Sequence, residues 1–469
     1  MTSQTQGHML IDAPVLVAGA GVSGLGAARM LSALGVEYTV ADDSASGRDA
    51  VRDATGAPVI TTAEAAERFA DFATVVTSPG WRPDTPLLVQ AAQAGLEVIG
   101  DVELCFRLDR AGAFGAPREW LVVTGTNGKT TTTGMLASIM TKCGHDTGKR
   151  AQACGNIGVA VADALLAEER VDVLVAELSS FQLHWSTQLV PDAGVLLNLA
   201  DDHLDWHGSF ANYASDKAKV LRAPSAVAGA DDPEVTKLVA ATSRDDVIGF
   251  TLRAPEPGQV GVEGGRLVSR WRSDDPVDLA SATRIQPPGA AGVLDAAAAA
   301  AVALTQGATP AHIQDGLDAY RVADHRGAVV HSGGGVDWVD NSKATNPHAA
   351  HSALSGAGTV VWVAGGQLKG ASVDELIHEH SAQFRAVALM GVDREILRDA
   401  LKQLAPQVPI FVTESTDPAE AMDNVVEFAA SVAQPGDSVL LAPAAASLDM
   451  YSGMSARGDE FRAAAMRHC

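Results

Sequence analysis

The sequence is poor in cysteine, in aromatic residues and in basic charge. Its four cysteines lack the CxxC spacing of a zinc site and are scattered along the chain at Cys105, Cys143, Cys154 and Cys469. Scattered cysteines of this kind are typical of free thiols in the cytosol, so we expect no zinc site. Aromatic residues make up only 5% of the 469 residues, whereas 47% are hydrophobic. We therefore expect a large core built mainly from small aliphatic side chains.

Acidic residues outnumber basic ones. The 57 Asp and Glu residues against 34 Lys and Arg residues give the chain a net charge of −23. A field of that sign repels nucleic acid and anionic membranes over most of the surface. We therefore expect neither as a partner, and any phosphate ligand has to be held by positive charge gathered locally.

Long hydrophobic runs are also missing. The longest apolar tract, Ala296–Leu304, is far too short to span a bilayer. The opening segment MTSQTQGHML has no basic stretch followed by an apolar one, so we expect no signal peptide. These features predict a cytoplasmic protein that does not enter a membrane, with a monomer as the simplest assembly.

Short apolar runs alternate with Ala- and Leu-rich helical stretches along the whole chain. This alternation is typical of an α/β architecture with mainly parallel sheets. A chain of 469 residues is long enough for about three domains, and the pattern weakens near Gly100-Asp101 and again near Ala323. We therefore expect domains at residues 1–100, 101–322 and 323–469. A polar stretch near residues 250–285 is expected to form short antiparallel strands.

A glycine-rich turn lies near the start of the second domain, in VVTGTNGKTTT (residues 122–132). It separates a predicted strand from a predicted helix, so its N–H groups and the helix dipole would face an anion. Lys129 would reach the terminal phosphates of a nucleoside triphosphate, and the Thr130 hydroxyl would hold Mg²⁺. The spacing is shorter than usual, because Gly125 lies only three residues before Gly128. The expected phosphate-binding residues are Gly125, Thr126, Asn127, Gly128, Lys129, Thr130 and Thr131.

A second glycine-rich turn, Gly19-Ala20-Gly21-Val22-Ser23-Gly24, follows the first predicted strand, and Asp42 ends the next one. This pattern satisfies the dinucleotide-binding fingerprint. Taken alone, it favours NAD or FAD and hence an oxidoreductase. The motif itself requires only a tight strand–helix turn near a phosphate or a ribose, so the ligand stays open at this point.

Acidic residues and histidines follow two further strands of the second domain. Glu177 ends the apolar run VDVLVA, where a carboxylate can hold Mg²⁺ or orient water. His203 and His207 lie among three aspartates and could ligate a metal, with a solvated loop as the alternative. Lys217 lies in a predicted helix capped by Ser209, where a surface position is the default.

The predicted strands of the third domain end in polar loops. Three of these loops, at residues 341–346, 365–369 and 446–448, contain two lysines and several hydroxyl groups. Ligands of open α/β sheets bind at the carboxyl ends of the strands. We therefore expect a crevice there that suits an acidic substrate.

In this order, the motifs resemble those of the Mur ligases, the ATP-dependent enzymes that form amide bonds in bacterial cell-wall precursors. The resemblance covers nearly the whole chain and rests on GTNGKTT (125–131), GNIG (155–158), ELSSFQL (177–183), the loop around His203, and Lys217. NSKATN (341–346) and APAAASLD (442–449) are similar to segments of the members that add D-glutamate. The resemblance implies a Rossmann-like N-terminal domain, a P-loop-type central ATPase domain and a Rossmann-like C-terminal domain.

The resemblance also implies ligands and the residues that bind them. It replaces the dinucleotide by UDP, with contacts at Val22, Ser23, Asp42, Ser78, Gly80, Asn156, Ser179 and Gln182. For ATP it adds Asp295, Arg326 and Asn341 to the phosphate loop. For D-glutamate it implies Lys343, Thr345, Lys369, Ser447, Leu448 and Met454. It implies two Mg²⁺ ions, held by Thr130, Glu177, His203 and a carbamylated Lys217, and a catalytic set of Lys129, Glu177, His203 and Lys217.

Three positions depart from the family pattern. Asn341 stands where an aspartate is usual, Ala291-Gly292 falls where relatives often have His-Asn, and Met454 replaces an aromatic residue of some relatives. Asn341 can still bond a ribose hydroxyl, but it brings no charge.

The implied reaction joins D-glutamate to UDP-N-acetylmuramoyl-L-alanine through an acyl phosphate, in cytoplasmic peptidoglycan precursor synthesis. The third domain is expected to close on the second by a hinge near Ala323 when ATP binds, which would shield the acyl phosphate from water. Three alternatives stay open. They are a ligase of the same chemistry that adds another amino acid or glutamates folate (like folylpolyglutamate synthase), an NAD-dependent oxidoreductase, and a non-catalytic nucleotide sensor.

Overall fold

The computed structural model describes residues 11–273, 275–322, 324–355 and 357–468. Ala323, where a hinge is expected, Cys469 and the first ten residues lie outside these ranges. The chain forms two compact units, one made of Met1–Ala282 and Asp295–Ala319, the other of Thr283–Leu294 and Tyr320–Cys469. The division into three domains at the expected boundaries stays a prediction.

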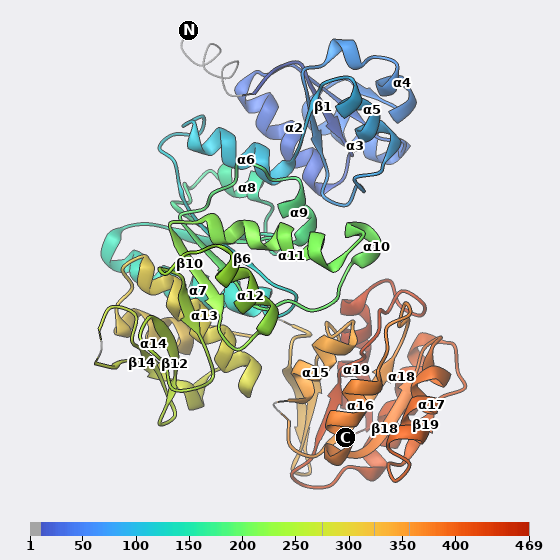
Figure 1. Ribbon diagram of the computed structural model, residues 1–469. Helices are drawn as coiled ribbons and strands as arrows, with labels where there is room; N and C mark the ends of the chain where they lie inside the picture. Colours follow the sequence, from blue (N-terminus) through green and yellow to red (C-terminus); the bar gives the residue numbers. More distant parts are fainter. Residues whose placement is uncertain (1–10, 274, 323, 356, 469) are drawn as a thin grey trace. The chain divides into compact units, whose positions relative to one another are not determined.

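The N-terminal part of the first unit, drawn in blue in Figure 1, is a parallel sheet with helices around it. Its five described strands have the order β3-β2-β1-β4-β5, a Rossmann-like order. The strands are β1 (Val15–Ala18), β2 (Tyr38–Ala41), β3 (Val59–Ile60), β4 (Thr74–Thr77) and β5 (Glu97–Gly100). The helices are α2 (Val22–Leu34), α3 (Ala45–Thr55), α4 (Thr62–Ala66), α5 (Pro86–Gln93) and α6 (Asp101–Arg110).

The second sheet of this unit has nine described strands in the order β14-β13-β12-β11-β10-β9-β6-β8-β7. Pairing is parallel from β12 to β7 and antiparallel among β12, β13 and β14, which confirms the antiparallel strands expected near residues 250–285. The strands are β6 (Glu119–Thr124), β7 (Ala151–Gly155), β8 (Val173–Glu177), β9 (Ala193–Leu196), β10 (Ser225–Gly229), β11 (Ile248–Phe250), β12 (Gln259–Glu263), β13 (Arg266–Ser269) and β14 (Val277–Ser281).

Small residues allow the helices around this sheet to pack closely. In α13, Ala296–Ala301 is fully buried. On α14, a Cβ added at Gly316 would lie 2.5 Å from Ile139 Cα on α7, and Ser138 Oγ donates to Gly316 O at 2.7 Å. The helices are α7 (Lys129–Thr147), α8 (Val161–Leu165), α9 (Ser180–His184), α10 (Leu204–His207), α11 (Phe210–Ala218), α12 (Pro233–Ala241), α13 (Ala290–Thr305) and α14 (Pro310–Ala319).

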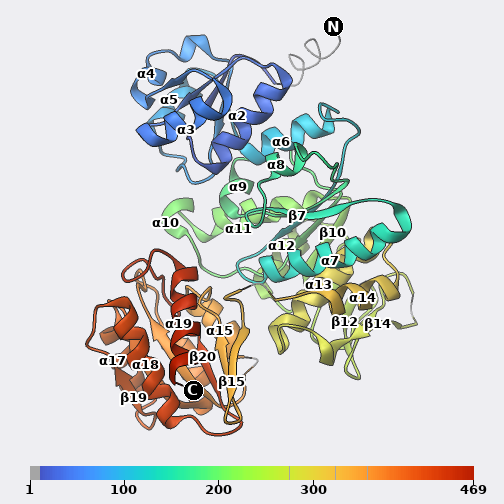
Figure 2. The ribbon, with the colours of Figure 1, turned by 180° about the vertical axis from the view of Figure 1, so that it is seen from behind.

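The second unit contains one sheet with helices on both faces. Its described strands have the order β15-β16-β20-β17-β18-β19 and are parallel apart from the β15–β16 pair. Trp362 of β17 packs into the core beneath α15, α16 and α17, whereas Val361 and Val363 face the core beneath α18 and α19, which Figure 2 shows in front of the sheet. The strands are β15 (Ala328–Gly333), β16 (Val336–Asp340), β17 (Val360–Gly365), β18 (Phe384–Met390), β19 (Ile410–Val412) and β20 (Ser438–Leu441). The helices are α15 (Pro347–Leu354), α16 (Asp374–His380), α17 (Arg394–Leu404), α18 (Pro418–Val432) and α19 (Met454–His468).

The hairpin of β15 and β16 is a feature that the sequence analysis missed. Gly334 and Gly335 form its two-residue loop with φ of 60° and 81°. Positive φ at both loop residues is what a tight hairpin of right-twisted strands requires, and a Gly-Gly pair adopts it readily. The expected α/β class with mainly parallel sheets is confirmed. Within the described residues, no helix combines the length and apolar character needed to cross a membrane.

Candidate active site

The glycine-rich turn at residues 125–130 joins β6 to the N-terminus of α7, as predicted. Gly128 is the N-terminal cap of α7 and has φ of 80°, a backbone conformation that favours glycine. A Cβ at this position would lie 2.2 Å from Oδ1 of Asp295, so the aspartate at the start of the buried part of α13 packs against the turn. The structure thus places Asp295 beside the expected phosphate-binding residues.

The end of β9 holds this turn in place. Asn198 Oδ1 accepts a hydrogen bond from Asn127 N at 2.8 Å, and Asn198 Nδ2 donates to Asn127 O at 3.2 Å. The Thr126 hydroxyl lies 2.8 Å from Tyr213 OH and accepts from Ala200 N at 3.0 Å. The sequence analysis missed Asn198 and Tyr213, because the contact of Asn198 depends on the pairing of β9 with β6 and that of Tyr213 on the packing of α11 against the turn.

Lys129 and Thr130 lie where the turn enters the helix. Lys129 Nζ donates to the carbonyl oxygens of Gly125 at 2.9 Å and Thr126 at 2.7 Å. Thr130 Oγ1 donates to Glu177 Oε2 at 2.6 Å. The Glu177 side chain is almost fully buried, and its other oxygen accepts from Asn156 Nδ2 at 3.0 Å. The predicted pair of Thr130 and Glu177 is therefore brought together, and a hydroxyl beside a carboxylate is a donor set that suits Mg²⁺.

Lys217 is buried, so the default prediction of a surface position is wrong. It is only 2% exposed, because α11 packs against α9 and the turn. Its Nζ donates to Gly125 O at 2.7 Å and to Thr124 Oγ1 at 3.4 Å. Among the described residues, no carboxylate lies within ion-pair distance of Nζ. Burial, followed by the charge of Lys129, lowers the pKa of Lys217 well below its usual 10.5.

His203 lies close enough to Lys217 and Lys129 for their charges to act on it. Its backbone has φ of 52°, and its ring packs on Phe181 with 4.7 Å between ring centroids. Burial is the main cause that lowers the pKa of His203, and the charges of Lys217 and Lys129 add to the effect against the opposing charge of Asp202. The imidazole is therefore neutral at neutral pH, the form that accepts a proton or binds a metal.

His207, the second histidine of this loop, points elsewhere. It is buried, with Nε2 3.0 Å from Ser180 Oγ and Nδ1 3.2 Å from Asp216 Oδ2. The same Asp216 oxygen lies 2.9 Å from His184 Nδ1, and Lys219 Nζ lies 2.9 Å from the other oxygen. His203 and His207 do not occur together in a cluster of possible metal ligands among the described residues. His207 instead belongs to a network that ties α9, α10 and α11 together.

The N-terminal glycine-rich turn of residues 19–24 is closed by Asp42. The Asp42 carboxylate accepts from the backbone N–H of Ala20 and of Ser44, both at 2.7 Å. Asp42 therefore orders the turn by accepting hydrogen bonds from main-chain N–H groups. In the dinucleotide fingerprint, the corresponding carboxylate would bind a ribose. Val22 at the start of α2 is 76% exposed, and Ser78 Oγ is buried with no hydrogen-bond partner among the described residues.

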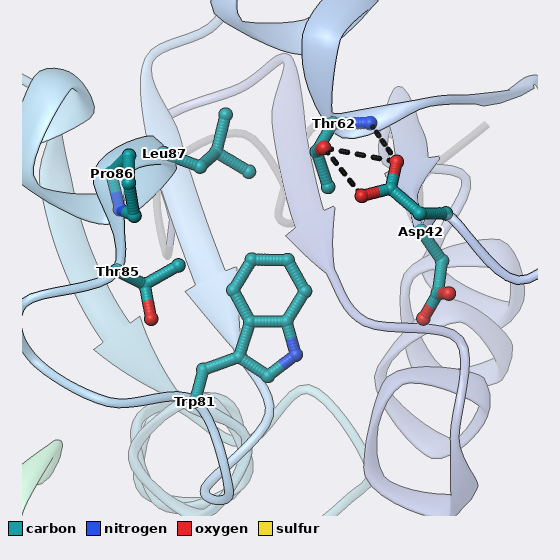
Figure 3. A pocket seen from close by; sticks show the side chains of 7 residues that line it. Asp42, Thr62, Trp81, Thr85, Pro86 and Leu87 are labelled. Carbon is teal, nitrogen blue, oxygen red and sulfur yellow. Dashed lines mark hydrogen bonds between the residues drawn. The ribbon is translucent and has the colours of Figure 1, made fainter.

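A cavity of about 420 Å³ opens beside Asp42. Figure 3 shows the ring of Trp81 between Leu87 on one side and Thr62 on the other. Asp43 fixes Thr62 by accepting from its N–H at 3.0 Å and from its hydroxyl. Trp81 and Thr62 went unnoticed in the sequence, since neither belongs to a recognisable motif.

Asn156 directly follows β7. Ser179 and Gln182 follow β8, the neighbouring strand that ends at Glu177. Ser179 caps α9 by accepting from Gln182 N at 3.2 Å, and Gln182 Oε1 accepts from Ser179 N at 2.9 Å. This reciprocal capping box orders the segment that follows Glu177.

In the second unit, the expected amino-acid-binding residues follow β16, β17 and β20. Ser447 is buried, Leu448 is 66% exposed, and Lys369 has φ of 53°. The loops after β17 and β20 are joined by backbone hydrogen bonds in both directions between Gln367 and Ala446. Ser342 Oγ donates to Met454 O at 2.7 Å, which links the loop after β16 to the start of α19. Lys343 and Thr345 follow Ser342 in that loop.

A buried arginine, Arg457 of α19, connects these loops and was missed in the sequence. Its guanidinium donates to Ser342 O at 2.9 Å and Ser342 Oγ at 3.0 Å, to Ala445 O at 3.1 Å and to Gly365 O at 3.2 Å. Burial lowers the pKa of Arg457 to about 10.

Arg326 and Asn341 are the two residues of this unit that we expect to contact ATP. They directly follow His325 and Asp340 in the chain. Asp340 is fully buried, with Oδ2 2.6 Å from His325 Nδ1 and Oδ1 accepting from Ser342 N. Asn341 is held at the end of β16 by donating its N–H to Leu441 O at 2.9 Å. Contact of these residues with ATP stays a prediction.

Three family models match successive parts of the chain. They are the Mur ligase MurD-like N-terminal domain over residues 13–100, the Mur ligase middle domain over residues 123–303, and the Mur ligase glutamate ligase domain over residues 325–445.

Curated relatives match over nearly the full length. The chain is 56% identical over 459 residues to the UDP-N-acetylmuramoylalanine–D-glutamate ligase of Corynebacterium diphtheriae, covering 97% of this chain and 96% of that protein. It is 45% identical over 481 residues to the ligase of the same name from Mycolicibacterium smegmatis, covering 96% of each chain.

Solved structures with low sequence identity share the fold. The UDP-N-acetylmuramate-alanine ligase MurC of Thermotoga maritima is similar with a TM-score of 0.56 at 18% identity, covering 95% of this chain and 97% of the other. The MurF ligase of the same organism, in complex with ADP, gives a TM-score of 0.56 at 17% identity, covering 92% of this chain and 96% of the other.

Proposed function

Because this chain belongs to the Mur ligase family, we propose that it is the ATP-dependent ligase that adds D-glutamate to UDP-N-acetylmuramoyl-L-alanine in peptidoglycan synthesis. The observation that carries the proposal is that four side chains converge around the glycine-rich turn of residues 125–130. They are Lys129, Thr130, Glu177 and Lys217. Its specificity for D-glutamate is supported by near-full-length relatives that bear this name.

The reaction needs ATP because an amide does not form to a useful extent from a carboxylate and an ammonium in water. The L-alanyl carboxylate attacks the γ-phosphorus in line, ADP leaves, and an acyl phosphate results. The amine of D-glutamate then attacks the acyl carbon, and phosphate leaves from the tetrahedral intermediate. The first step brings two anions together, so the positive groups at the turn supply the main stabilisation.

The residues of the turn are suited to this task. The N-terminus of α7 directs backbone N–H groups and the positive end of its dipole toward the phosphates. Lys129 Nζ donates to two backbone carbonyls of its own turn, and it can exchange these bonds for phosphate oxygens. Bound Mg²⁺ would neutralise charge on the phosphate oxygens, and Thr130 and Glu177 would hold the first ion.

For Lys217 we propose carbamylation. A buried amine whose pKa is lowered well below its usual 10.5 gives up its proton more readily than a surface lysine, and the uncharged amine can react with CO₂ to give a carbamate and a proton. The product is an anion that would help His203 to hold a second Mg²⁺. A carboxylate beside His203, or His203 itself when it does not ligate the metal, would take the proton that the D-glutamate ammonium must lose before it attacks.

The substrate-binding residues divide into four groups according to the part of the substrates that each would bind. We propose that Val22, Ser23, Ser78 and Gly80, with Asp42 as the organiser of the turn, bind the UDP moiety, and that Asn156, Ser179 and Gln182 bind the sugar–diphosphate part. Asp295, Arg326 and Asn341 would contact ATP. D-Glutamate would be bound by Lys343, Thr345, Lys369, Ser447, Leu448 and Met454. Since one chain supplies all these residues and the reaction consumes ATP, we propose a cytoplasmic monomer.

An amino-acid panel tests the proposal. Purified protein with ATP, Mg²⁺ and UDP-N-acetylmuramoyl-L-alanine should release ADP rapidly with D-glutamate and at a background rate with L-glutamate, L-lysine or meso-diaminopimelate. A preference for another amino acid would assign a different ligase of the same chemistry. No ADP release with any of them, together with binding of NAD, would favour the oxidoreductase alternative.

A further inference from the structure

Three side-chain atoms converge between α15 and α16 of the second unit. Nδ1 of His351 lies 2.9 Å from Glu379 Oε2 and 3.0 Å from His380 Nε2. The three atoms all lie within 4.8 Å of one another. None of these residues belongs to the proposed reaction.

The contacts of Ser355 favour the tautomer of His351 that carries its proton at Nε2. The Ser355 hydroxyl donates to His351 O at 2.8 Å, so its only proton is engaged. Ser355 Oγ also lies 3.4 Å from His351 Nε2, and at that contact it can only accept. With its proton at Nε2, neutral His351 turns the lone pair of Nδ1 toward Glu379 and His380.

That lone pair meets a carboxylate. One atom, Nδ1 of His351, is approached by an anionic oxygen and by a second imidazole nitrogen. The single proton that His380 can offer from Nε2 satisfies one of these contacts and leaves the lone pair of Nδ1 facing the lone pair of Glu379. A cation at the point of convergence is attracted to all three atoms at once.

His380 has the character of a metal ligand. It is 4% exposed, its ring lies 4.8 Å from that of His351, and its Nδ1 has no hydrogen-bond partner among the described residues. Gln383 lies beside it, and Oε1 of Gln383 likewise has no hydrogen-bond partner in the described part of the chain. Metal-ligating histidines usually donate their second N–H to such an acceptor.

We propose that His351, Glu379 and His380 form a binding site for a divalent transition metal ion of the Zn²⁺ class, with water in the fourth position. Two imidazoles and one carboxylate suit this class, whereas Mg²⁺ and Ca²⁺ prefer oxygen ligands. Ligands of tetrahedral Zn²⁺ lie about 3.3 Å apart. The distances of 2.9 Å from His351 Nδ1 to Glu379 Oε2 and of 3.0 Å to His380 Nε2 would therefore have to lengthen only slightly.

The other histidine cluster of the described residues does not compete for this assignment. Asp216, between His184 and His207, already has the Lys219 ammonium at 2.9 Å from one oxygen and His184 at 2.9 Å from the other. Its charge is therefore satisfied without a metal. The cysteine spacing predicts no zinc site, but the ligands between α15 and α16 are imidazoles and a carboxylate.

Metal binding by the full chain tests the proposal. The protein is treated with a chelator and kept in millimolar Mg²⁺, which occupies oxygen-rich sites. One sample is then dialysed against Zn²⁺. A parallel sample is dialysed against Co²⁺, and its visible absorption is recorded. We expect one tightly bound equivalent and tetrahedral Co²⁺ bands. His351→Ala and Glu379→Gln should weaken binding about tenfold or more. The matched control His378→Ala, an exposed histidine on the same helix, should bind like the wild type.

A second measurement guards against misfolded variants. Both substituted side chains are part-exposed, and circular dichroism reports whether each variant is folded. Zn²⁺ should raise the melting temperature of the wild type and of His378→Ala, but not of His351→Ala. The proposal is overturned if the wild type binds no stoichiometric Zn²⁺, if both ligand variants bind it unchanged, or if binding is lost in His207→Ala instead.

Discussion

At the scale of single residues, the burial of Lys217 has the largest chemical consequence. A lysine inside a protein is costly as a cation, and this one has backbone and hydroxyl oxygens as its hydrogen-bond acceptors. The site therefore favours the uncharged amine, which is the form that a carbamate requires. A motif search alone cannot reveal this, because the residue looks like an ordinary surface lysine in an amphipathic helix.

Replacing Lys217 by alanine should lower the rate of ADP release by about 10²–10³-fold, since the anion proposed to help hold the second Mg²⁺ is lost. Short carboxylic acids such as acetate or propionate should partly restore the rate by filling the vacated space with a carboxylate. The matched control is Lys237→Ala, which removes a side chain that is 70% exposed and should leave the rate unchanged. Full activity of Lys217→Ala without added acid would rule out the carbamate role.

At the scale of elements, the positions of the loops depend on contacts between segments that are far apart in the sequence. The strand–turn–helix of β6 and α7 could be predicted because glycine, lysine and threonine spacing is local. The clamp of Asn198 on that turn could not, since it requires β9 to pair with β6. His207 looked like a partner of His203, yet the geometry of α10 turns it toward Asp216.

Arg457 is another such long-range contact, and it joins the loops after β16, β17 and β20. Arg457→Ala should raise the KM for D-glutamate about tenfold or more, because each charge-assisted hydrogen bond contributes about 1.5–3 kcal/mol to the loop geometry. The KM for UDP-N-acetylmuramoyl-L-alanine should change little, since its proposed contacts lie in the first unit. Steady-state kinetics with each substrate varied in turn measures this split.

Chemical rescue separates positioning from general destabilisation. Guanidinium at low millimolar concentration should lower the KM for D-glutamate in Arg457→Ala, while sodium chloride at the same ionic strength should not. Equal increases in the KM of both substrates, without rescue, would show that Arg457 supports only folding.

At the scale of the whole molecule, histidines whose pKa values are lowered in the folded chain link stability to pH. Burial is the leading cause that lowers the pKa of His203, His207 and His380 below the usual 6.5. The unfolded chain therefore takes up protons at these positions at a higher pH than the folded chain. By linkage, the free energy of unfolding falls as the pH drops below about 6.5 toward the folded-state pKa values.

We accordingly expect the melting temperature of the metal-free protein to fall by several degrees between pH 7.5 and pH 5.5, recorded by calorimetry at constant ionic strength. His207→Asn should reduce the dependence on pH, as one of the contributing groups is removed. A melting temperature that stays constant or rises on acidification would contradict this expectation.

The overall architecture was the most predictable level of description. Alternating apolar runs and turns predicted α/β layers, and the low aromatic content predicted the small-residue core seen in α13. The β15–β16 hairpin was missed because its Gly-Gly loop follows a strand that is only partly buried. The cavity at Trp81 was missed because it forms only when loops after β2, β3 and β4 come together.

The central claim is that the turn leading into Lys129 directs the terminal phosphate of ATP onto the carboxylate of UDP-N-acetylmuramoyl-L-alanine. The most direct test uses that substrate with ¹⁸O in its L-alanyl carboxylate, and mass spectrometry of the phosphate released when D-glutamate is added. An acyl phosphate requires one ¹⁸O atom of the substrate to leave in each phosphate, and this is the predicted result. Phosphate without ¹⁸O, released along with the amide product, would contradict the account.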